Sequence, residues 1–329
     1  MSDGDGASAE VVDFLTTVPL LDGIPESELT ELARVMRRRG LPAGQVLWRQ
    51  EDVAREMLLV VDGQVSVSLL LPGHRTVELS RVGRGELLGE VPLLDGRLHP
   101  SGARVVEPAN FLALNHADFA ALVSRSHPTA FTLKRRIADV GCARLRQQLA
   151  ALVASLGGDA AHPPVAGAQA GADALEYCGP PASSYVRRLG TFHSLDPLAL
   201  WGFLTAGRYA RVPAGHTIVP EGAVSEACYL TINGAVEKVV ERGGRRIRVG
   251  LAGPGHAFGY EGLIDGGASP VTATTRERTL VLVLPREAFE RLFHGEDAGS
   301  HAFLDVIHRD LMAALRQALR PHARLAGSV

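Results

Sequence analysis

Histidine, cysteine and serine are the side chains that most often carry metal or covalent chemistry, and none of them falls in a recognisable pattern. The twelve histidines show no His-Glu-x-x-His arrangement and no repeated spacing. Cys142, Cys178 and Cys228 lie far apart, with no pair at metal-ligand spacing. Serines such as Ser183 and Ser184 lack the glycine frame of a nucleophile elbow, and no Walker-type phosphate loop occurs. The sequence therefore predicts no metal, no cofactor and no catalytic centre, so we expect a protein that is not an enzyme.

Clusters of basic residues are the next candidates for chemistry, because they can bind nucleic acid. Arg37, Arg38 and Arg39 form one run, and Lys134, Arg135 and Arg136 form another. We expect the first run to end a helix, where cations complement the helix dipole, and the second to lie on the polar face of a helix. The net charge of −2 gives no overall basic field for nucleic acid or an anionic membrane.

The elements that position these residues belong to an internal repeat. Residues 42–44, Pro-Ala-Gly, recur at 213–215, and residues 62–63 recur at 233–234, both at an offset of 171. After a one-residue gap the offset becomes 170: Gly85, Gly89, residues 95–96, Pro100, Ala103 and Phe119 match Gly255, Gly259, residues 265–266, Pro270, Ala273 and Phe289. A collinear match over this length indicates a duplication.

Between the two copies lies a stretch rich in glycine, alanine and proline, with almost no apolar periodicity. Such a composition is typical of a flexible linker. We therefore expect a first domain at residues 14–156, an unstructured linker at 157–184, and a second domain at 185–325. These two copies are called the first and second repeat below.

Each repeat has the same expected order of elements. A short amphipathic helix, with Pro25 and Glu26 at its start in the first repeat, precedes short alternating strands separated by glycine turns. Gly63 and Gly234 are expected to take a positive φ. A longer helix closes each repeat, beginning near Pro128 in the first and ending at Pro321 in the second. The fold class is therefore α+β and mainly β, with two antiparallel β-roll (jelly-roll) domains flanked by helices.

This order of elements resembles the cyclic-nucleotide-binding domain, which occurs in Crp/Fnr (catabolite activator) regulators and in regulatory subunits of protein kinase A. The residues that carry the resemblance are the Pro-Ala-Gly turns, the Asp-Gly and Asn-Gly pairs, and the segments at 85–90, 100–103, 255–259 and 270–274. The resemblance implies that a glutamate after Phe-Gly accepts a hydrogen bond from the ribose of the ligand. It also implies that an arginine after a proline binds the cyclic phosphate, since a buried anion needs a cation.

The first repeat keeps part of this pattern. Gly89 and Glu90 are present, but Ser101 stands where the arginine is expected. Arg97, His99 and Arg104 are nearby cations that could substitute. The ligand-binding residues that the resemblance implies in the first repeat are Gly89, Glu90, Val91, Ser101, Gly102 and Ala103.

The second repeat departs further from the pattern. Tyr260 replaces the glutamate, Glu261 comes one place late, and Val271 replaces the arginine. We expect a degenerate site here, with the implied residues Gly259, Tyr260, Glu261, Val271 and Thr272. Whatever ligand binds is therefore expected in the first repeat.

Three functions remain open from the sequence. The first is a regulatory sensor that binds a small anionic, nucleotide-like ligand, such as a cyclic nucleotide, and signals through its closing helices. The second is a ligand-free scaffold for protein interaction or dimerisation, because the apolar stripes on the closing helices could self-associate. The third is a Crp/Fnr-type transcription regulator, which the sequence disfavours because only ten residues follow Leu319, too few for a helix-turn-helix.

Sequence composition also bears on location. The acidic, polar start of the chain is unlike a secretory signal, and no run approaches the roughly 18 apolar residues of a membrane helix. Sparse, unpaired cysteines are typical of a reducing compartment. We expect a cytoplasmic protein without membrane contact.

Overall fold

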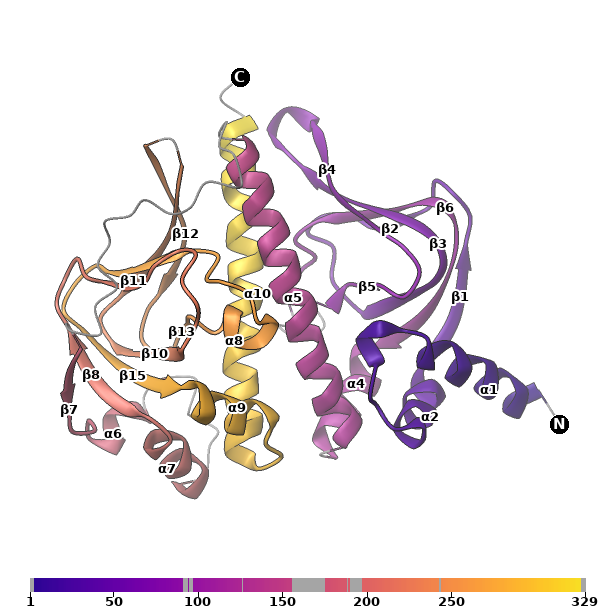
Figure 1. Cartoon of the computed structure of the whole chain (residues 1–329). Helices are drawn as coiled ribbons and strands as arrows, with labels where there is room; N and C mark the ends of the chain where they lie inside the picture. The colour runs from indigo at the N-terminus through magenta and orange to yellow at the C-terminus, as the bar shows by residue number, and fades with distance from the viewer. Residues whose placement is uncertain are drawn as a thin grey trace. The chain divides into compact units, whose positions relative to one another are not determined.

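A computed structural model of the chain describes residues 3–90, 94, 97–125, 127–155, 175–187, 189, 197–242 and 244–326. The chain divides into two compact units. Unit 1 contains Met1–Val140 and Ala326–Val329, and unit 2 contains Gly141–Leu325. Each unit holds one β-roll with its helices (Figure 1).

Unit 1 begins with three short helical segments and continues with an antiparallel sheet. The helical elements are α1 (Asp3–Thr16), η1 (Pro19–Leu21), α2 (Glu26–Val35), η2 (Pro72–His74), α4 (His116–Ser124) and the start of α5 (Pro128–Ser155). The strands are β1 (Arg37–Leu41), β2 (Val46–Trp48), β3 (Glu56–Leu70), β4 (Thr76–Val82), β5 (Leu87–Leu88) and β6 (Gly102–Asn115). They form one sheet in the order β1-β6-β3-β4, in which β2 also pairs with β6 and β5 with β3.

Unit 2 contains the remaining residues of α5 and two sheets. Its other helices are α6 (Ser183–Val186), α7 (Pro197–Thr205), α8 (Glu261–Asp265), α9 (Arg286–His294) and α10 (Ala298–Ala326). Its strands are β7 (Glu176–Cys178), β8 (Arg208–Val212), β9 (Thr217–Val219), β10 (Ala227–Asn233), β11 (Val236–Arg242), β12 (Arg245–Ala252), β13 (Ala257–Phe258), β14 (Thr272–Thr275) and β15 (Thr279–Pro285). The sheet orders are β13-β10-β15-β8-β7 and β12-β11-β14-β9.

The two rolls repeat the same strand pairing, with the offsets that the sequence predicts. Arg37 pairs with Ala113 in β1 and β6, and Arg208 pairs with Val283 in β8 and β15, which are offsets of 171 and 170. The same offsets relate the pair Leu70–Thr76 to the pair Glu241–Arg246. The prediction of two β-rolls is confirmed, and the one-residue gap falls in the hairpin between β3 and β4.

Strands β3 and β6 of the first repeat are long and bent, whereas the second repeat divides each of them into two strands. Gly63 lies at the bend of β3 with φ +83°, and Gly234 lies between β10 and β11 with φ +91°. A Cβ on Gly63 would lie 2.3 Å from the carbonyl oxygen of Pro108 on β6. The expected positive φ is therefore confirmed, and the close approach of β6 to β3 also excludes a side chain at this bend.

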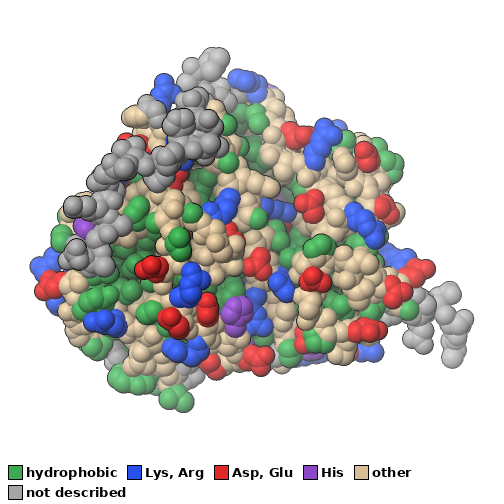
Figure 2. Space-filling model, viewed as in Figure 1, with side chains coloured by type: hydrophobic (Ala, Val, Ile, Leu, Met, Phe, Trp, Pro, Cys, Tyr) green, Lys and Arg blue, Asp and Glu red, His purple; other side chains and the backbone are tan. Residues whose placement is uncertain are grey.

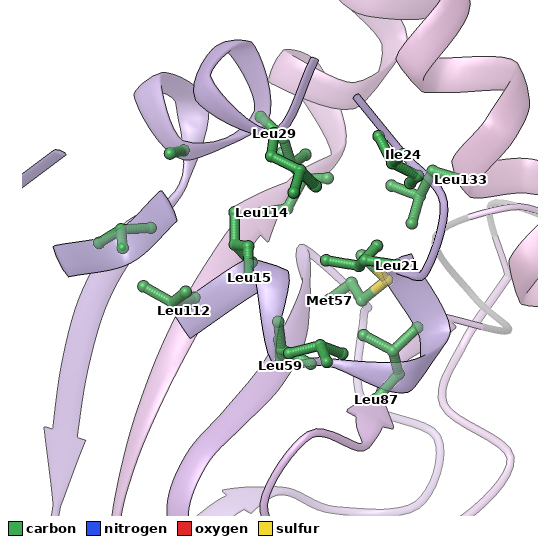
Figure 3. Close-up of a cluster of buried hydrophobic side chains, with 14 of the residues drawn as sticks. Leu15, Leu21, Ile24, Leu29, Met57, Leu59, Leu87, Leu112, Leu114 and Leu133 are labelled. Atoms are coloured by element: carbon green, nitrogen blue, oxygen red, sulfur yellow. The ribbon is translucent and has the colours of Figure 1, made fainter. Parts of the chain in front are cut away.

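A hydrophobic core joins the N-terminal helices of unit 1 to one face of the sheet (Figure 3). Leu15 of α1 and Leu29 of α2 pack with Leu59, Leu114 and Leu133, all of them at most 2% exposed. The sequence has Leu29, Leu32 and Met36 at helical spacing, which predicts one apolar face. Leu29 and Leu32 lie on the buried face of α2, whereas Met36 lies just beyond the end of the helix. The helix thus positions β1, which follows it directly.

A second apolar cluster lies in each roll. In unit 1 it includes Val60, Val65, Val82, Val105 and Phe111, with Trp48 packed against it. In unit 2 it includes Val212, Val219, Val236, Phe258 and Val281, with Tyr229 packed against it. Alternating valines on neighbouring strands place these side chains on one face of each sheet.

Some local predictions from the sequence are wrong. The run 134–136 does not lie wholly on the polar face of its helix, because Lys134 is only 5% exposed. Arg37, Arg38 and Arg39 form most of strand β1 instead of ending a helix, because α2 stops at Val35 and this run pairs with β6. The closing helix α10 does not end at Pro321 but continues to Ala326. A helix can pass a proline when it gives up one backbone hydrogen bond.

The expected linker also contains regular structure near its end. Residues 157–174 lie outside the described residues, but Glu176–Cys178 form β7, which pairs with β8, and Ser183–Val186 form α6. Three residues cannot hold a strand alone, and the neighbouring β8 supplies their hydrogen bonds. The expectation of an unstructured 175–184 is therefore corrected, and the domain boundaries themselves stay predictions.

Within unit 2, the second half of α5 lies beside α10 (Figure 1). A Cβ on Gly141 of α5 would lie 2.7 Å from Cδ2 of Leu311, which is fully buried. The apolar stripe of α10 is thus covered within one chain at this point.

The face of the molecule shown in Figure 2 carries charges of both signs. Acidic and basic side chains are interspersed over it, in keeping with the net charge of −2. Among the described residues, no helix is both long enough and apolar enough to cross a membrane.

Candidate ligand-binding sites

The site that the family resemblance implies lies between β5 and β6 in the first repeat, and between β13 and β14 in the second. We call residues 89–103 the first cassette and residues 259–272 the second cassette. Both begin with a glycine in the left-handed region, Gly89 at φ +77° and Gly259 at φ +76°. Each glycine directly follows a two-residue strand. In the first repeat this strand is β5, which pairs with β3, and in the second it is β13, which pairs with β10.

Glu90 is the most buried polar residue of the first cassette, with no exposed surface. The left-handed turn at Gly89 directs the chain from β5 toward this position. A Cβ on Gly89 would lie 2.9 Å from the carbonyl oxygen of Glu56 and within 3.6 Å of the Trp48 and His99 rings. Glycine is therefore required at position 89 by its φ and by the lack of space.

The rings of Trp48 and His99 stack beside Gly89. Their centroids are 4.1 Å apart and their planes differ by 10°, and His99 is 4% exposed. Trp48 Nε1 donates a hydrogen bond of 3.1 Å to the carbonyl oxygen of Ser101. Trp48 thus brings Gly89 and Ser101, two residues that the sequence reasoning named, to the same place.

The rest of the first cassette belongs to the sheet. Gly102 pairs with Ser68 and Ala103 with Val67, and Ala103 is buried. Of the three nearby cations, Arg97 and Arg104 are exposed and only His99 is buried. Val91 lies outside the described residues. Trp48, the last residue of β2, was missed from the sequence, and no pattern around it pointed to this contact.

Tyr260 occupies the glutamate position of the second cassette and is fully buried. Its hydroxyl group has no hydrogen-bond partner among the described residues. Burial raises the pKa of the Tyr260 phenol well above its usual range, and the negative charges of Glu261 and Asp310 raise it further. Tyr260 is therefore a neutral core side chain.

Thr272 connects the second cassette to an ion pair in the roll. Its hydroxyl oxygen accepts a hydrogen bond of 3.1 Å from the backbone N–H of Glu221. The carboxylate of Glu221 pairs with both terminal nitrogens of Arg242, and each side chain is only 12% exposed. The hydrogen bond to Glu221 raises the pKa of the Arg242 guanidinium. A cation is present in this roll, but an internal carboxylate already pairs with it.

The closing helix α10 also holds the start of the second cassette. Asp310 is 3% exposed, and its Oδ2 accepts a 2.5 Å hydrogen bond from the backbone N–H of Ala257. Its Oδ1 lies 2.5 Å from Nδ1 of His256, and Arg309 donates to the carbonyl oxygen of Gly255. These contacts fix the turn that leads to Gly259.

Glu261 and Val271 of the second cassette are buried like Tyr260. Glu261 is the first residue of α8 and 2% exposed, and Val271 is 5% exposed. Arg276, the nearby cation of this repeat, pairs with Glu237 at 3.4 Å instead. In the part of the chain that the structure describes, no group of three or more acidic, histidine or cysteine side chains could hold a metal ion.

Known sequences resemble part of the chain. The Thermus thermophilus cyclic AMP receptor protein is 32% identical over 125 residues, which is 37% of this chain and 58% of that protein. A cyclic nucleotide-gated potassium channel of Rhizobium etli is 32% identical over 122 residues, 37% of this chain and 33% of the channel. The type II regulatory subunit of the Drosophila melanogaster cAMP-dependent protein kinase is 28% identical over 127 residues, 39% of this chain and 33% of the subunit. The chain thus spans between one third and three fifths of the length of these relatives.

Solved structures resemble the chain at lower identity. The regulatory domain of Toxoplasma gondii protein kinase A with cAMP is 18% identical, with a TM-score of 0.35, and the match covers 89% of this chain and 94% of that one. A cyclic nucleotide-binding domain of Methylobacillus flagellatus is 21% identical, with a TM-score of 0.40, and the match covers 44% and 80%.

The family model for the cyclic nucleotide-binding domain matches the chain twice. The matched residues are 38–126 and 209–296, together more than half of the chain. Each match contains one roll and one cassette. The chain therefore belongs to the cyclic nucleotide-binding domain family, with two such domains in tandem.

Proposed function

We propose that this protein is a regulatory sensor whose first repeat binds a small anionic, nucleotide-like ligand and whose closing helices pass on the signal. The observation that carries the proposal is the buried Glu90 after the left-handed turn at Gly89. In the family this carboxylate accepts a hydrogen bond from a ribose hydroxyl. A fully buried carboxylate is expensive to keep unless it has a role in packing or binding.

The first repeat is favoured over the second because of the residues at the positions of the family's glutamate and arginine. The first cassette keeps the carboxylate at position 90, and the buried His99 and the stacked Trp48 lie beside the neighbouring Gly89. The second cassette has the buried Tyr260 and Val271 at the corresponding positions. The second repeat therefore lacks both groups that the family uses to bind a cyclic nucleotide.

Cyclic AMP is the first ligand to test, because it stands in the names of relatives such as the Thermus receptor protein. Ser101 cannot form the charge-assisted pair that an arginine forms with a phosphate. Such a bond contributes about 1.5–3 kcal/mol. We expect affinity for cAMP to be lower than that of an arginine-containing site by about tenfold or more.

Calorimetric titration of cAMP and cGMP tests the assignment. Ser101→Arg is expected to strengthen binding about tenfold, because it restores the cation in the first cassette. Val271→Arg makes the same change at the equivalent position of the second cassette and serves as the matched control, with affinity expected to stay at the wild-type value. A gain of affinity in Val271→Arg alone would place the site in the second repeat.

A ligand-free scaffold is the second candidate. Two observations favour it: apolar side chains cluster inside both rolls, and Glu221 pairs with Arg242 in the second roll. The protein's own side chains thus already contact one another inside the rolls. In that case neither nucleotide binds even to Ser101→Arg. The proposal also includes self-association through the closing helices and a location in the cytoplasm without direct DNA binding.

A further inference from the structure

The side chain of Arg146 on α5 makes three hydrogen bonds to one short stretch of the second cassette. Its Nε donates to Oδ2 of Asp265 at 2.6 Å, and its Nη2 donates to Oδ1 at 2.8 Å. Its Nη1 donates to the carbonyl oxygen of Ala268 at 2.6 Å. The planar guanidinium thus binds a carboxylate with two parallel bonds and a backbone carbonyl with a third, which is the geometry that arginine favours over lysine.

The backbone of the second cassette is shaped to receive this side chain. Asp265 is the last residue of α8, and Gly266 ends the helix with φ +71°. The backbone N–H of Gly267 donates a 2.9 Å hydrogen bond to the same Asp265 Oδ1. A Cβ on Gly267 would lie only 2.6 Å from Nη2 of Arg146, so the guanidinium can approach this closely only because residue 267 is glycine.

Electrostatics favour the charged form of both partners. Burial alone would raise the pKa of the Asp265 carboxyl, but hydrogen bonds from Arg146 and Gly267 outweigh it, and the pKa lies below its ordinary value. The hydrogen bond to Asp265 raises the pKa of the Arg146 guanidinium. The side chains are 30% and 18% exposed, so solvent screens this pair only in part.

Arg146 lies on the helix that closes the first repeat, but its side chain contacts the second repeat. Helix α5 begins at Pro128 in unit 1 and closes the first repeat, whereas Arg146 and α8 both belong to unit 2. Asp265 and Ala268 lie between the two positions where the second cassette has lost the family's polar residues, Tyr260 and Val271. A guanidinium from the first repeat is therefore bound by the second cassette, which has Val271 where the family pattern has an arginine.

We propose that Arg146 is a positioning residue that holds α8 and the 266–268 turn of the second cassette in place from the closing helix of the first repeat. The contact replaces a ligand as the element that orders this cassette. A displacement of α5 then moves α8 as well, so the first repeat controls the conformation of the second. The inference goes beyond the proposed function, because the contact needs no ligand in either roll.

Hydrogen exchange measured by mass spectrometry on the full chain tests the proposal without a nucleotide. The informative amides are those of Leu263, Ile264, Gly267 and Ser269, whose hydrogen bonds lie within or beside the held segment. Arg146→Gln is expected to speed exchange in a peptide covering 262–269 by about tenfold, the order of magnitude for loss of a charge-assisted bond. Arg144→Gln removes the same charge two residues earlier on α5 and is expected to leave this peptide at the wild-type rate.

A charge exchange separates positioning from general stability. Combining Arg146→Asp with Asp265→Arg restores opposite charges and is expected to recover much of the protection that either single variant loses. The proposal is overturned if Arg146→Gln exchanges like the wild type in 262–269. It is also overturned if exchange rises equally in strands β10 and β15, because the contact would then only stabilise unit 2 as a whole.

Discussion

At the scale of single residues, the second cassette departs from its family most clearly at Tyr260. A carboxylate in this position faces a ligand, whereas the tyrosine is buried in the protein with a hydroxyl group that has no partner among the described residues. A buried polar group without a hydrogen bond costs about 1–3 kcal/mol. The tyrosine therefore contributes through its ring and not through its hydroxyl group.

Replacing Tyr260 with phenylalanine tests this interpretation. Tyr260→Phe is expected to raise the unfolding free energy by about 1 kcal/mol, because it removes the cost of the hydroxyl group. Tyr209→Phe is the matched control, since the Tyr209 hydroxyl donates a 3.2 Å hydrogen bond to the carbonyl oxygen of Leu204 and its loss should destabilise. Urea unfolding measures both. A destabilised Tyr260→Phe would show that the hydroxyl group is bound.

The Asp265 carboxylate makes stability depend on pH. Its pKa in the folded protein lies below the ordinary 3.8, because bonds from Arg146 and Gly267 outweigh the opposing effect of burial. Its stabilising contribution is therefore fully present above pH 3.8 and is lost as pH falls through the folded value.

Comparison of melting temperatures between wild type and Asp265→Asn measures this contribution. The difference between the two proteins is expected to be constant from pH 6 down to about 3.8, and to shrink below that value. A difference that grows as the pH falls would contradict the assigned direction of the shift.

At the scale of elements, the bend in the paired strands β3 and β6 shapes the first roll. Gly63 allows it because its φ is positive and because a side chain there would meet the backbone at Pro108. Gly44 also has a positive φ, +85°, but a Cβ there would find no atom within 4 Å. A comparison of substitutions at the two glycines therefore separates the cost of the left-handed backbone from the cost of crowding.

Alanine at these two positions should have different effects. Gly44→Ala is expected to cost about 1–2 kcal/mol, which is the strain of a left-handed residue with a side chain. Gly63→Ala is expected to cost distinctly more, since it adds the clash with Pro108 to the same strain. Denaturant unfolding of the two variants gives the comparison, and equal losses would mean that β6 can move away from the bend.

At the scale of the whole molecule, the closing helices are already engaged within the chain. Leu311 and Leu315 of α10 are at most 2% exposed, and Gly141 of α5 packs against Leu311. The apolar stripe from which the sequence predicted self-association is therefore already packed within a single copy of the protein. Self-association itself stays a prediction.

A single substitution distinguishes the two roles of the stripe. Leu311→Ser is expected to lower the melting temperature strongly, because a buried leucine contributes about 2–5 kcal/mol against alanine and serine adds a buried hydroxyl group. Light scattering on the same samples gives the mass. A fall in mass with little change in melting temperature would instead assign the stripe to contacts between copies.

Much of this fold could be predicted from the sequence, because the repeat constrains it twice. The offsets of 171 and 170 recur in the strand pairing, and the positive φ of Gly63 follows from its place between two alternating runs. The prediction for Arg37 to Arg39 was wrong because a run of arginines has no pattern typical of a strand. This run is a strand only because it pairs with β6.

The candidate sites were less predictable, since their contacts join distant parts of the chain. Arg146 and Asp265 are 119 residues apart, and Trp48 and Ser101 are 53 apart. No spacing rule connects such pairs, because they meet only after the rolls and closing helices have formed. The sequence could name Gly89, Glu90 and Ser101 from the family motif, but not the tryptophan that lies beside two of them.

The stoichiometry of cAMP binding, measured by calorimetry on the full chain, tests the central claim most directly. The account predicts one binding event per chain, which is lost in Glu90→Ala and kept in Glu261→Ala, the matched change in the second cassette. Circular dichroism on both variants confirms that each is folded. Two binding events per chain, or one that survives Glu90→Ala and disappears in Glu261→Ala, would contradict the assignment of the ligand to the first repeat.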